Sequence, residues 1–443
     1  MTELNESLFI VLHFTEQEKI MNFEFIEGGV AAAQGFTASG VLNKIKANRT
    51  TFDTALIFSD TLCNAAGVFT QNRVKAECVK FTKNQIKNGK AQAVIMNSGN
   101  ANACTGEQGY KNAEKEAEAV ASKLNVSKDD VLVCSTGVIG QQLPVEKILN
   151  GLDESVRLLS KKGNVEARQA IMTTDTKYKE VALKAEIGGK TVTMGTMAKG
   201  SGMIHINLGT MLSVVTTDCA ISSEMLEKAL RLSVAKSYNC VSIDGDTSTN
   251  DTLLILANGK AGNAEITSEG KDFNAFLEAL DTLNVQMAKK IAADGEGASR
   301  LVTCNVHGAD TVENARGLAK AVICSNLVKA AFFGADANWG RILDAMGYSG
   351  FNFTPEKTSV SFFSRENSKR YFEAGAQNGG EEHSVRVFDH GVPLDFDEDL
   401  AKKILSEESV EILVELEDGT AEGTAWGCDL TYDYVKINGD YRT

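Results

Sequence analysis

Stretches with the patterns of short strands and of amphipathic helices alternate along almost the whole chain. Residues 179–200 alternate with period two on both sides of Gly188 and Gly189, which predicts a β-hairpin. Hairpins mixed with helices predict a layered α/β or α+β fold rather than a doubly wound sheet. The predicted strands are 54–60, 65–70, the first parts of 91–100 and 130–140, 211–217, 252–257, 409–416, 419–428 and 432–438, with a polar loop at 244–251. The predicted helices are 106–125, one that begins at Pro144 and carries Val145, Ile148, Leu149 and Leu152, one that begins at Ser222 or Ser223, and 271–293.

The length and composition are those of a globular protein with more than one lobe. At 443 residues the chain exceeds the size at which a single hydrophobic core usually keeps growing. Hydrophobic residues make up 43% of the chain and charged residues 23%, which argues against a disordered protein. The formal net charge of -14 repels phosphate backbones, so no nucleic acid or anionic membrane is expected as a partner. A small zwitterion in a locally basic pocket is compatible with this charge.

The cysteines and histidines indicate neither disulfides nor a metal site. The nine cysteines are scattered singly and never form a C-x-x-C pair, which predicts reduced, buried thiols as in cytoplasmic proteins. The five histidines include no H-x-x-x-H pair, so a zinc site has no support.

The first 21 residues are interpreted as an extension. Their short apolar run, LFIVL, lacks a basic leading region and is followed by acidic residues, which predicts neither a signal peptide nor a membrane span. Met21 directly precedes the stretch NFEFIEGGV and is a candidate start.

Several glycine-rich or polar loops are excluded as sites by their spacing. GKAGNAEIT and SGNANACTG lack the spacing of a P-loop or a dinucleotide fingerprint. The loop DGDTSTNDT has Thr249 where a calcium loop needs glycine and Ile255 where it needs glutamate. STGVIG contains no G-x-S-x-G elbow.

Gly209 and Thr210 interrupt an apolar strand-like run, INLGTMLSVVTT, where glycine is unfavourable. A threonine hydroxyl is a poor nucleophile unless a base takes its proton. If the Gly209–Thr210 bond were cut, the new α-amine of Thr210, with a pKa of about 7.7 to 8.0, could serve as that base. A residue without Cβ before the bond would tolerate the strained backbone that such cleavage needs. From residue types alone, an ordinary strand threonine remains the better interpretation.

Motifs elsewhere in the sequence favour the nucleophile over the ordinary strand threonine at position 210. KGSGMIHINLGTMLSVVTTD (199–218) resembles the self-cleavage segment of the ornithine acetyltransferase (ArgJ) family. Further matches occur in the family's order, so the resemblance covers residues 22–443. These matches are GGVAAAQGF (28–36), NSGNANACTG (97–106), STGVIG (135–140), IMTTDT (171–176), DGDTSTNDT (244–252), DGEGASR (294–300), ANWGRI (337–342) and INGDYRT (437–443).

The resemblance implies an enzyme of arginine biosynthesis that transfers an acetyl group from N-acetylornithine to glutamate through an acetyl-threonine intermediate. It implies a layered α/β fold of the N-terminal-nucleophile type, with self-cleavage between residues 22–209 and residues 210–443 into two chains that associate as a heterotetramer or larger. It implies no metal and no organic cofactor. Whether acetyl-CoA is a second acetyl donor stays open.

Particular residues carry these implied roles. Thr210 matches the family's nucleophile, and Thr136 and Gly137 match its oxyanion hole, a group of donors that stabilises the tetrahedral oxygen. The implied substrate-binding residues are Thr173, Lys199, Thr210, Glu296, Asn438 and Thr443. A lysine can hold an α-carboxylate and a glutamate an ammonium group, although such residues are more often solvated surface charges.

The chain departs from the family near the cleavage site. The family usually has Ala-Pro where His205 and Ile206 stand, and alanine where Gly209 stands, which predicts slower or less complete cleavage. His205 is interpreted as a spacer. Two other classes remain open: a hydrolase, an amidase or aminopeptidase that passes the acyl group to water, and a binding relative that never cleaves.

Overall fold

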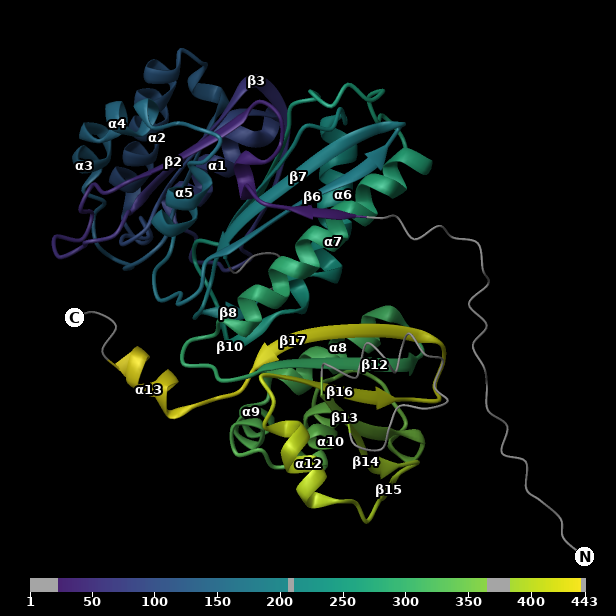
Figure 1. Cartoon of the computed structure of the whole chain (residues 1–443). Helices are drawn as coiled ribbons and strands as arrows, with labels where there is room; N and C mark the ends of the chain where they lie inside the picture. Colours follow the sequence, from purple (N-terminus) through teal and green to yellow (C-terminus); the bar gives the residue numbers. More distant parts are fainter. Residues whose placement is uncertain (1–22, 206–210, 365–382, 440–443) are drawn as a thin grey trace, which may run out of the picture.

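The computed structural model describes residues 23–205, 211–364 and 383–439, which form two lobes (Figure 1). The large lobe is built on a nine-stranded sheet, and the small lobe on a six-stranded sheet. Helix α7 (Lys271–Ala293) extends from one lobe to the other, and the ribbon of β8 (Ile204–His205) and β10 (Ser242–Thr247) lies between them (Figure 1). The layered α/β fold expected from the sequence is therefore confirmed.

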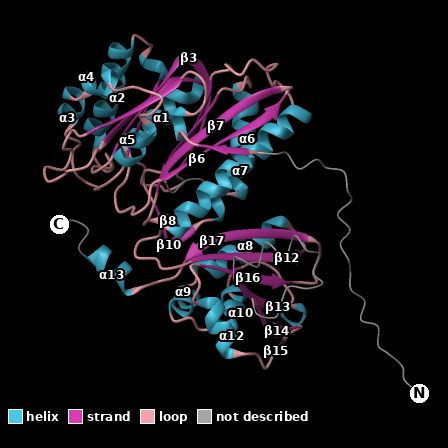
Figure 2. Ribbon diagram, in the orientation of Figure 1, coloured by secondary structure: helices cyan, strands magenta, loops and turns pink. Residues whose placement is uncertain are grey.

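The large lobe is a mixed sheet between layers of helices (Figure 2). Its strand order is β1-β6-β7-β9-β11-β3-β4-β5, with β2 paired to β3. The strands are β1 (Glu24–Ile26), β2 (Phe36–Val41), β3 (Thr54–Phe69), β4 (Lys90–Asn97), β5 (Val131–Ser135), β6 (Lys179–Ile187), β7 (Lys190–Lys199), β9 (Leu212–Thr217) and β11 (Thr252–Ala257). The helices are α1 (Glu77–Gln85), α2 (Gly106–Leu124), α3 (Val145–Asn150), α4 (Leu152–Arg157), α5 (Asn164–Ala170), α6 (Ser223–Lys236) and α7.

The central strands β9 and β11 are buried on both faces, which explains their almost continuous apolar sequences. They pair in parallel, with Thr252 opposite Leu212. Leu253 and Ile255 point into the core beneath α6 and α7, whereas Leu254 and Leu256 point into the core on the other side. This alternation is the period of two that any strand imposes.

The small lobe packs helices against its own sheet, whose order is β15-β14-β13-β16-β12-β17. The strands are β12 (Leu301–Ala309), β13 (Ser359–Ser364), β14 (Ser384–Asp389), β15 (Val392–Pro393), β16 (Ser409–Glu415) and β17 (Ala421–Cys428). The helices are α8 (Val312–Cys324), α9 (Asn326–Phe333), α10 (Trp339–Gly347) and α12 (Glu398–Leu405). After β17 the chain leaves this lobe and ends in α13 (Tyr432–Gly439), as Figure 1 shows.

Most predicted elements are confirmed, and several need correction. The two strands predicted at 54–60 and 65–70 form one strand, β3, which ends at Phe69, because the chain stays extended while its pairing with β4 shifts register between Phe58 and Cys63. The predicted polar loop at 244–251 is partly strand, since β10 reaches Thr247 and pairs with β8. The predicted hairpin is β6 and β7.

The C-terminal strand prediction at 432–438 is wrong, because these residues form helix α13. Among the strands that the structure describes, none pairs with this stretch of alternating aromatic and β-branched residues. Asp433 in the first turn and Lys436 in the last turn suit the helix dipole instead. The helix predicted from Pro144 is also shorter than expected: α3 ends before Gly151, and Leu152 begins α4.

All nine cysteines are free thiols, but the prediction that all are buried is wrong for two of them. Cys104 is exposed in the left-handed turn before α2, and Cys324 is half-buried at the end of α8. Among the described residues, no helix is both long enough and apolar enough to cross a membrane.

Residues on the two sides of position 210 share one sheet. Strand β7, which precedes it, pairs with β9, which follows it, and β11 lies between β9 and β3. The regions 22–209 and 210–443 are therefore interleaved in the large lobe, and neither has a sheet entirely of its own there.

Candidate active site

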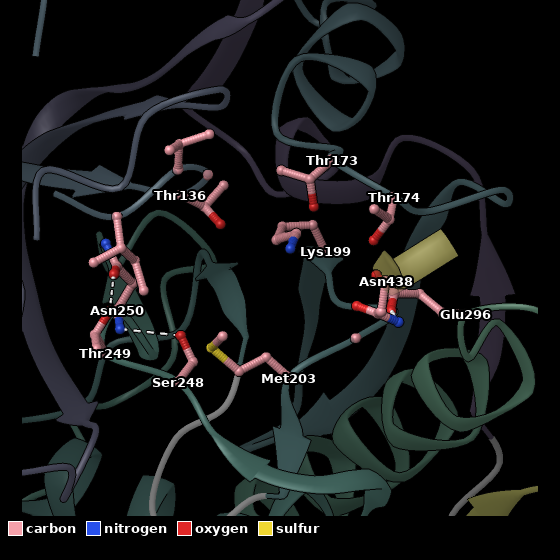
Figure 3. Close-up of a pocket in the computed structure, with 14 residues that line it drawn as sticks. Thr136, Thr173, Thr174, Lys199, Met203, Ser248, Thr249, Asn250, Glu296 and Asn438 are labelled. Carbon is pink, nitrogen blue, oxygen red and sulfur yellow. Dashed lines mark hydrogen bonds between the residues drawn. The ribbon is translucent and has the colours of Figure 1, made fainter. Parts of the chain in front are cut away.

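A cavity of about 270 Å³ lies where the large sheet, the β10–β11 connection and helix α13 meet (Figure 3). Six residues that the sequence singled out line it together. They are Thr136, Gly137, Thr173, Lys199, Glu296 and Asn438. In Figure 3, Lys199 points into the space between Thr136 on one side and the pair Glu296 and Asn438 on the other. The cavity is large enough for a small amino acid derivative.

The turn after β5 places Thr136 and Gly137 at the cavity. Its backbone is held by the Thr136 N–H, which donates to the carbonyl of Asn97 at 2.9 Å. Gly137 has a φ of +134°, and a Cβ there would lie 2.4 Å from the carbonyl carbon of Gly99. Only glycine permits this close backbone approach, because real Cβ atoms do not come so near.

The side chain of Asn250 holds this turn in place by hydrogen bonds. Its Nδ2 donates to the carbonyls of Ser135 at 2.8 Å and Ala101 at 2.5 Å, and its Oδ1 accepts from Thr249 Oγ1 at 2.6 Å. The side chain thus ties the end of β5 to the loop that packs against Gly137. Such a fully bonded amide is costly to replace in a buried position.

Lys199 ends β7 and is buried, with 8% of its surface exposed. Among the described residues, no carboxylate forms an ion pair with it. Nearby Asp175 is committed elsewhere, because it accepts hydrogen bonds from Lys179 Nζ at 2.6 Å and from the Gly200 N–H at 2.7 Å. Burial would raise the pKa of Asp175, but the charges of Lys199 and Lys179 outweigh it and lower that pKa to about 2.

The Asp175 carboxylate also shapes the loop that carries Thr173, since its Oδ2 accepts from the Thr173 N–H at 3.1 Å. On the other side of the loop, Asp294 accepts from the N–H groups of Thr176 and Lys177, each at 3.1 Å. Lys179 lies fully buried between Asp175 and Asp294 and pairs with both. This ion network fixes the loop after α5 against the end of α7.

Glu296 and Asn438 meet at the far end of the cavity. Asn438 Nδ2 donates to Glu296 Oε2 at 2.6 Å, which attaches helix α13 to the site. Glu296 is 6% exposed and lies against Gly202, where a Cβ would come within 2.3 Å of the carboxyl group. Lys199 and Glu296 are therefore buried, which excludes solvated surface charges, the alternative to the predicted binding role.

Three predicted site residues, Gly209, Thr210 and Thr443, lie outside the described residues. Met211, the next residue after Thr210, is described and buried. It lines a smaller cavity of about 20 Å³ together with Thr136, Lys199 and Asp251. The chain directly after position 210 therefore reaches the same site.

His205 lies outside both cavities. Its Nδ1 is 3.1 Å from Ser242 Oγ and 3.5 Å from Cys324 Sγ. Burial, and then the charge of Lys320, lower the pKa of His205 to about 4, so its ring is neutral near neutral pH.

Sequence reasoning gave no role to several residues that the structure places at these cavities. They are Thr174, Gly202, Met203, Ser248, Thr249, Asn250 and Asp251. Four of them belong to the motif DGDTSTNDT, which was predicted to be a polar loop, was excluded as a calcium site and served as a point of resemblance. Its mixture of hydroxyl, amide and carboxyl groups directly before an apolar strand was the available signal.

The two lobes and this cavity define an α/β protein whose candidate active site is flanked by a glycine turn. One buried cation and one buried carboxylate face the cavity, which suits the two charged ends of an amino acid. In the described part of the chain, no cluster of three or more His, Cys, Asp or Glu residues could hold a metal ion.

The family follows from sequence comparison. Residues 37–443 match the model of the ArgJ family, and the chain belongs to that family. The chain is 48% identical over 420 residues to the arginine biosynthesis bifunctional protein ArgJ of Caldanaerobacter subterraneus subsp. tengcongensis, covering 95% of this chain and 100% of that protein. It is also 48% identical over 421 residues to the protein of the same name from Symbiobacterium thermophilum, with 95% and 100% covered.

Solved structures are similar over part of the chain. One is ornithine acetyltransferase from Mycobacterium tuberculosis, complexed with ornithine. It is 41% identical, covers 43% of this chain and 100% of its own, and has a TM-score of 0.39. The resemblance to this family that was inferred from the sequence motifs is thus confirmed by the family match.

Proposed function

We propose that the protein is a glutamate N-acetyltransferase of arginine biosynthesis, which moves the acetyl group of N-acetylornithine to glutamate. Membership of the ArgJ family supports an acyltransferase of this pathway. The observation that carries the proposal is the meeting of Thr136, Gly137, Lys199 and Glu296 in one cavity beside Met211. Use of acetyl-CoA as a second donor is compatible with the relatives' name, bifunctional protein, and is part of the test below.

The proposed mechanism is acyl transfer through Thr210. The Thr210 hydroxyl oxygen bonds to the acetamide carbon while its own α-amine takes the hydroxyl proton. The carbon–nitrogen bond to ornithine then breaks, and the leaving amine takes that proton. The amine of glutamate attacks the resulting acetyl ester, gives up a proton and releases the Thr210 hydroxyl. Because the Thr136 N–H already donates to the Asn97 carbonyl, the Thr136 hydroxyl and the Gly137 N–H would stabilise the tetrahedral oxygen in both steps, at about 2.7 to 4 kcal/mol per donor.

The charged residues would hold the two ends of the amino acid. Lys199 is buried without an ion pair among the described residues, so it can bind an α-carboxylate. Glu296 sits at the other end and can bind an ammonium group, with Asn438 fixing its carboxylate. Thr173 would contribute a hydroxyl, and Thr443 would act from the C-terminal tail.

Self-cleavage between Gly209 and Thr210 would release the α-amine. The two chains would stay together, because β7 and β9 pair across this point within one sheet. We further propose assembly as a heterotetramer or larger, and action in the cytoplasm, where nine free thiols would remain reduced.

The first experiment combines intact mass spectrometry with a transfer assay on the purified full-length protein. Two fragments that sum to the full chain, and acetylglutamate formed from N-acetylornithine and glutamate, are expected. Parallel assays replace N-acetylornithine with acetyl-CoA. Acetate release that does not depend on glutamate would identify a hydrolase instead, and a single uncleaved, inactive chain would identify a binding relative.

The Thr210→Ala variant tests the nucleophile directly. It should remain a single full-length chain and transfer no acetyl group, because it has neither hydroxyl nor a freed terminal amine. A matched variant, Thr216→Ser, keeps a hydroxyl within the same strand region and should be processed normally. Normal processing of Thr210→Ala would refute the assignment.

A further inference from the structure

Asp251 is a buried acid at the active site to which the proposed mechanism gives no role. It is only 2% exposed and lines the smaller cavity with Thr136, Lys199 and Met211. That cavity, of about 20 Å³, is close to the size of one water molecule. Among the described residues, Asp251 Oδ2 has no hydrogen-bond partner. An unpartnered polar atom in a buried site calls for a functional explanation.

The strand register places Asp251 beside the chain that follows Thr210. Thr252 is opposite Leu212 in the parallel pair of β11 and β9, so Asp251 is opposite Met211. The Thr252 N–H donates to the carbonyl of Met211 at 2.9 Å, which locks this register. The groups that face the Asp251 carboxyl are the Ser248 and Thr70 hydroxyls and the Met211 N–H.

Asp251 and Asp175 lie near the same lysine, Lys199, but their pKa values shift in opposite directions. Asp175 is ionised and paired with Lys179. Burial raises the pKa of Asp251 well above its ordinary value, and its hydrogen bonds and the charge of Lys199 only partly offset this. The charged group that faces Asp251 is Lys199, on β7.

We propose that Asp251 is a positioning residue of the acyl-transfer site, whose buried carboxyl group, opposite Met211 and beside Lys199, orients the chain at Met211 and leaves the positive charge of Lys199 for the substrate carboxylate. The inference rests on the proposed function. An ionised Asp251 would compete with the substrate for Lys199 across the cavity. A neutral acid keeps the hydrogen bonds without that competition.

The test compares Asp251→Asn and Asp251→Leu with the wild type, using the full-length enzyme. The amide of Asn is neutral at every pH and can still accept from the Met211 N–H, whereas Leu has a similar shape and no polar atom. The matched control is Asp218→Asn. Asp218 is a buried acid after β9 that accepts from the N–H groups of Thr193 and Gln34 and lines neither cavity.

The readouts are kcat and KM for glutamate from about pH 6 to about pH 9. Near pH 6, kcat and KM of Asp251→Asn should stay within about threefold of the wild-type values. Towards pH 9, the KM for glutamate of Asp251→Asn should rise less than that of the wild type. The amine of glutamate titrates in the same way in the wild-type and Asp251→Asn assays. The difference between their two KM profiles therefore reports the titration of Asp251. Asp251→Leu should lose about tenfold to a hundredfold in kcat/KM, because the Met211 N–H loses its acceptor.

Thermal unfolding separates this role from a merely structural one. A neutral buried acid is ionised on unfolding, so the wild type should lose stability as pH rises above about 3.9 towards the raised folded-state pKa of Asp251, a loss that Asp251→Asn lacks. Asp251→Asn should therefore be at least as stable as wild type at pH 8, and Asp218→Asn should keep the wild-type KM profile.

Three results would overturn the inference while leaving the proposed function intact: an active wild type with an equally active Asp251→Leu, identical KM profiles for wild type and Asp251→Asn, or a folded and cleaved Asp251→Asn that transfers nothing at any pH. The last result would make Asp251 a proton carrier. A wild type that transfers no acetyl group would instead overturn the proposed function.

Discussion

The two walls of the cavity are built in different ways. The backbone wall is the turn Thr136–Ile139 with Ser248–Asn250, and the charged wall consists of Thr173, Lys199, Glu296 and Asn438. The backbone wall is held by hydrogen bonds to carbonyls and by a glycine that allows close packing. The charged wall is held by the buried ion pair of Lys179 and Asp175 and by helix α13, whose Asn438 bonds to Glu296.

This difference suggests that the two walls have different functions. The Gly137 N–H and the Thr136 hydroxyl, held by a rigid turn, suit a charge that exists only in the transition state, because they need little reorganisation when it forms. Charged side chains suit the permanent charges of a ground-state amino acid. Damage to the backbone wall should therefore lower kcat, and damage to the charged wall should mainly raise KM.

The largest effect is expected for Gly137→Ala. Its Cβ would meet the Gly99 carbonyl carbon at 2.4 Å, so the turn must move. We expect kcat to fall by about 10²- to 10³-fold, the usual loss when an oxyanion donor is misplaced, with a smaller change in KM. Steady-state kinetics measures both. Gly140→Ala is the matched control, because its φ is also positive but nothing lies within 4 Å of its Cβ.

Lys199→Met should break the charged wall. Methionine keeps the apolar stem and removes the charge, so KM for glutamate should rise by about tenfold to a hundredfold, the value of a charge-assisted hydrogen bond. The kcat should change less. Lys184→Met on β6, where the lysine is exposed and pairs with Glu24, should leave both constants unchanged. A fall in kcat alone for Lys199→Met would contradict the division between the walls.

Asn438→Ala should have a smaller effect of the same kind. It removes the 2.6 Å bond to Glu296 but leaves the carboxylate in place. KM should rise by about threefold to tenfold, less than the full value of a hydrogen bond to a charged group, because the Glu296 carboxylate itself remains to bind the substrate. Lys436→Ala, on the same helix and away from the cavity, is the control. A rise in KM as large as that of Lys199→Met would contradict this ranking and would mean that helix α13 itself covers the cavity.

The smallest effect on activity is expected for His205→Gln, since His205 belongs to neither wall. Its folded-state pKa of about 4 is below the unfolded value of about 6.5, so the unfolded chain binds more protons in between. Wild-type stability should therefore fall as pH drops from about 6.5 to about 4, and the variant should lose this dependence. Urea unfolding at several pH values measures it, and a changed kcat would show that His205 is more than a spacer.

The sequence predicted the helices and strands themselves better than which of them contact one another. β11 and the hairpin of β6 and β7 were found because a buried strand and a period-two pattern need no distant information. The prediction failed at 432–438, where strand or helix is decided by whether a neighbouring edge is available. The site residues came from motif resemblance, and Asn250 and Asp251 were missed because their burial and contacts depend on segments far away in the chain.

What the amino-acid sequence determined by itself was local and chemical: the layered α/β class, the family, and the residue types able to stabilise an oxyanion or hold a carboxylate. Only the tertiary structure decided which of them act together. It buried Lys199 and Glu296 at one cavity, paired Asp175 with Lys179, and placed Asp251 in a buried position opposite Met211. The physical reason is that desolvation and charge pairing depend on what surrounds a group in space, which the order of residues along the chain does not contain.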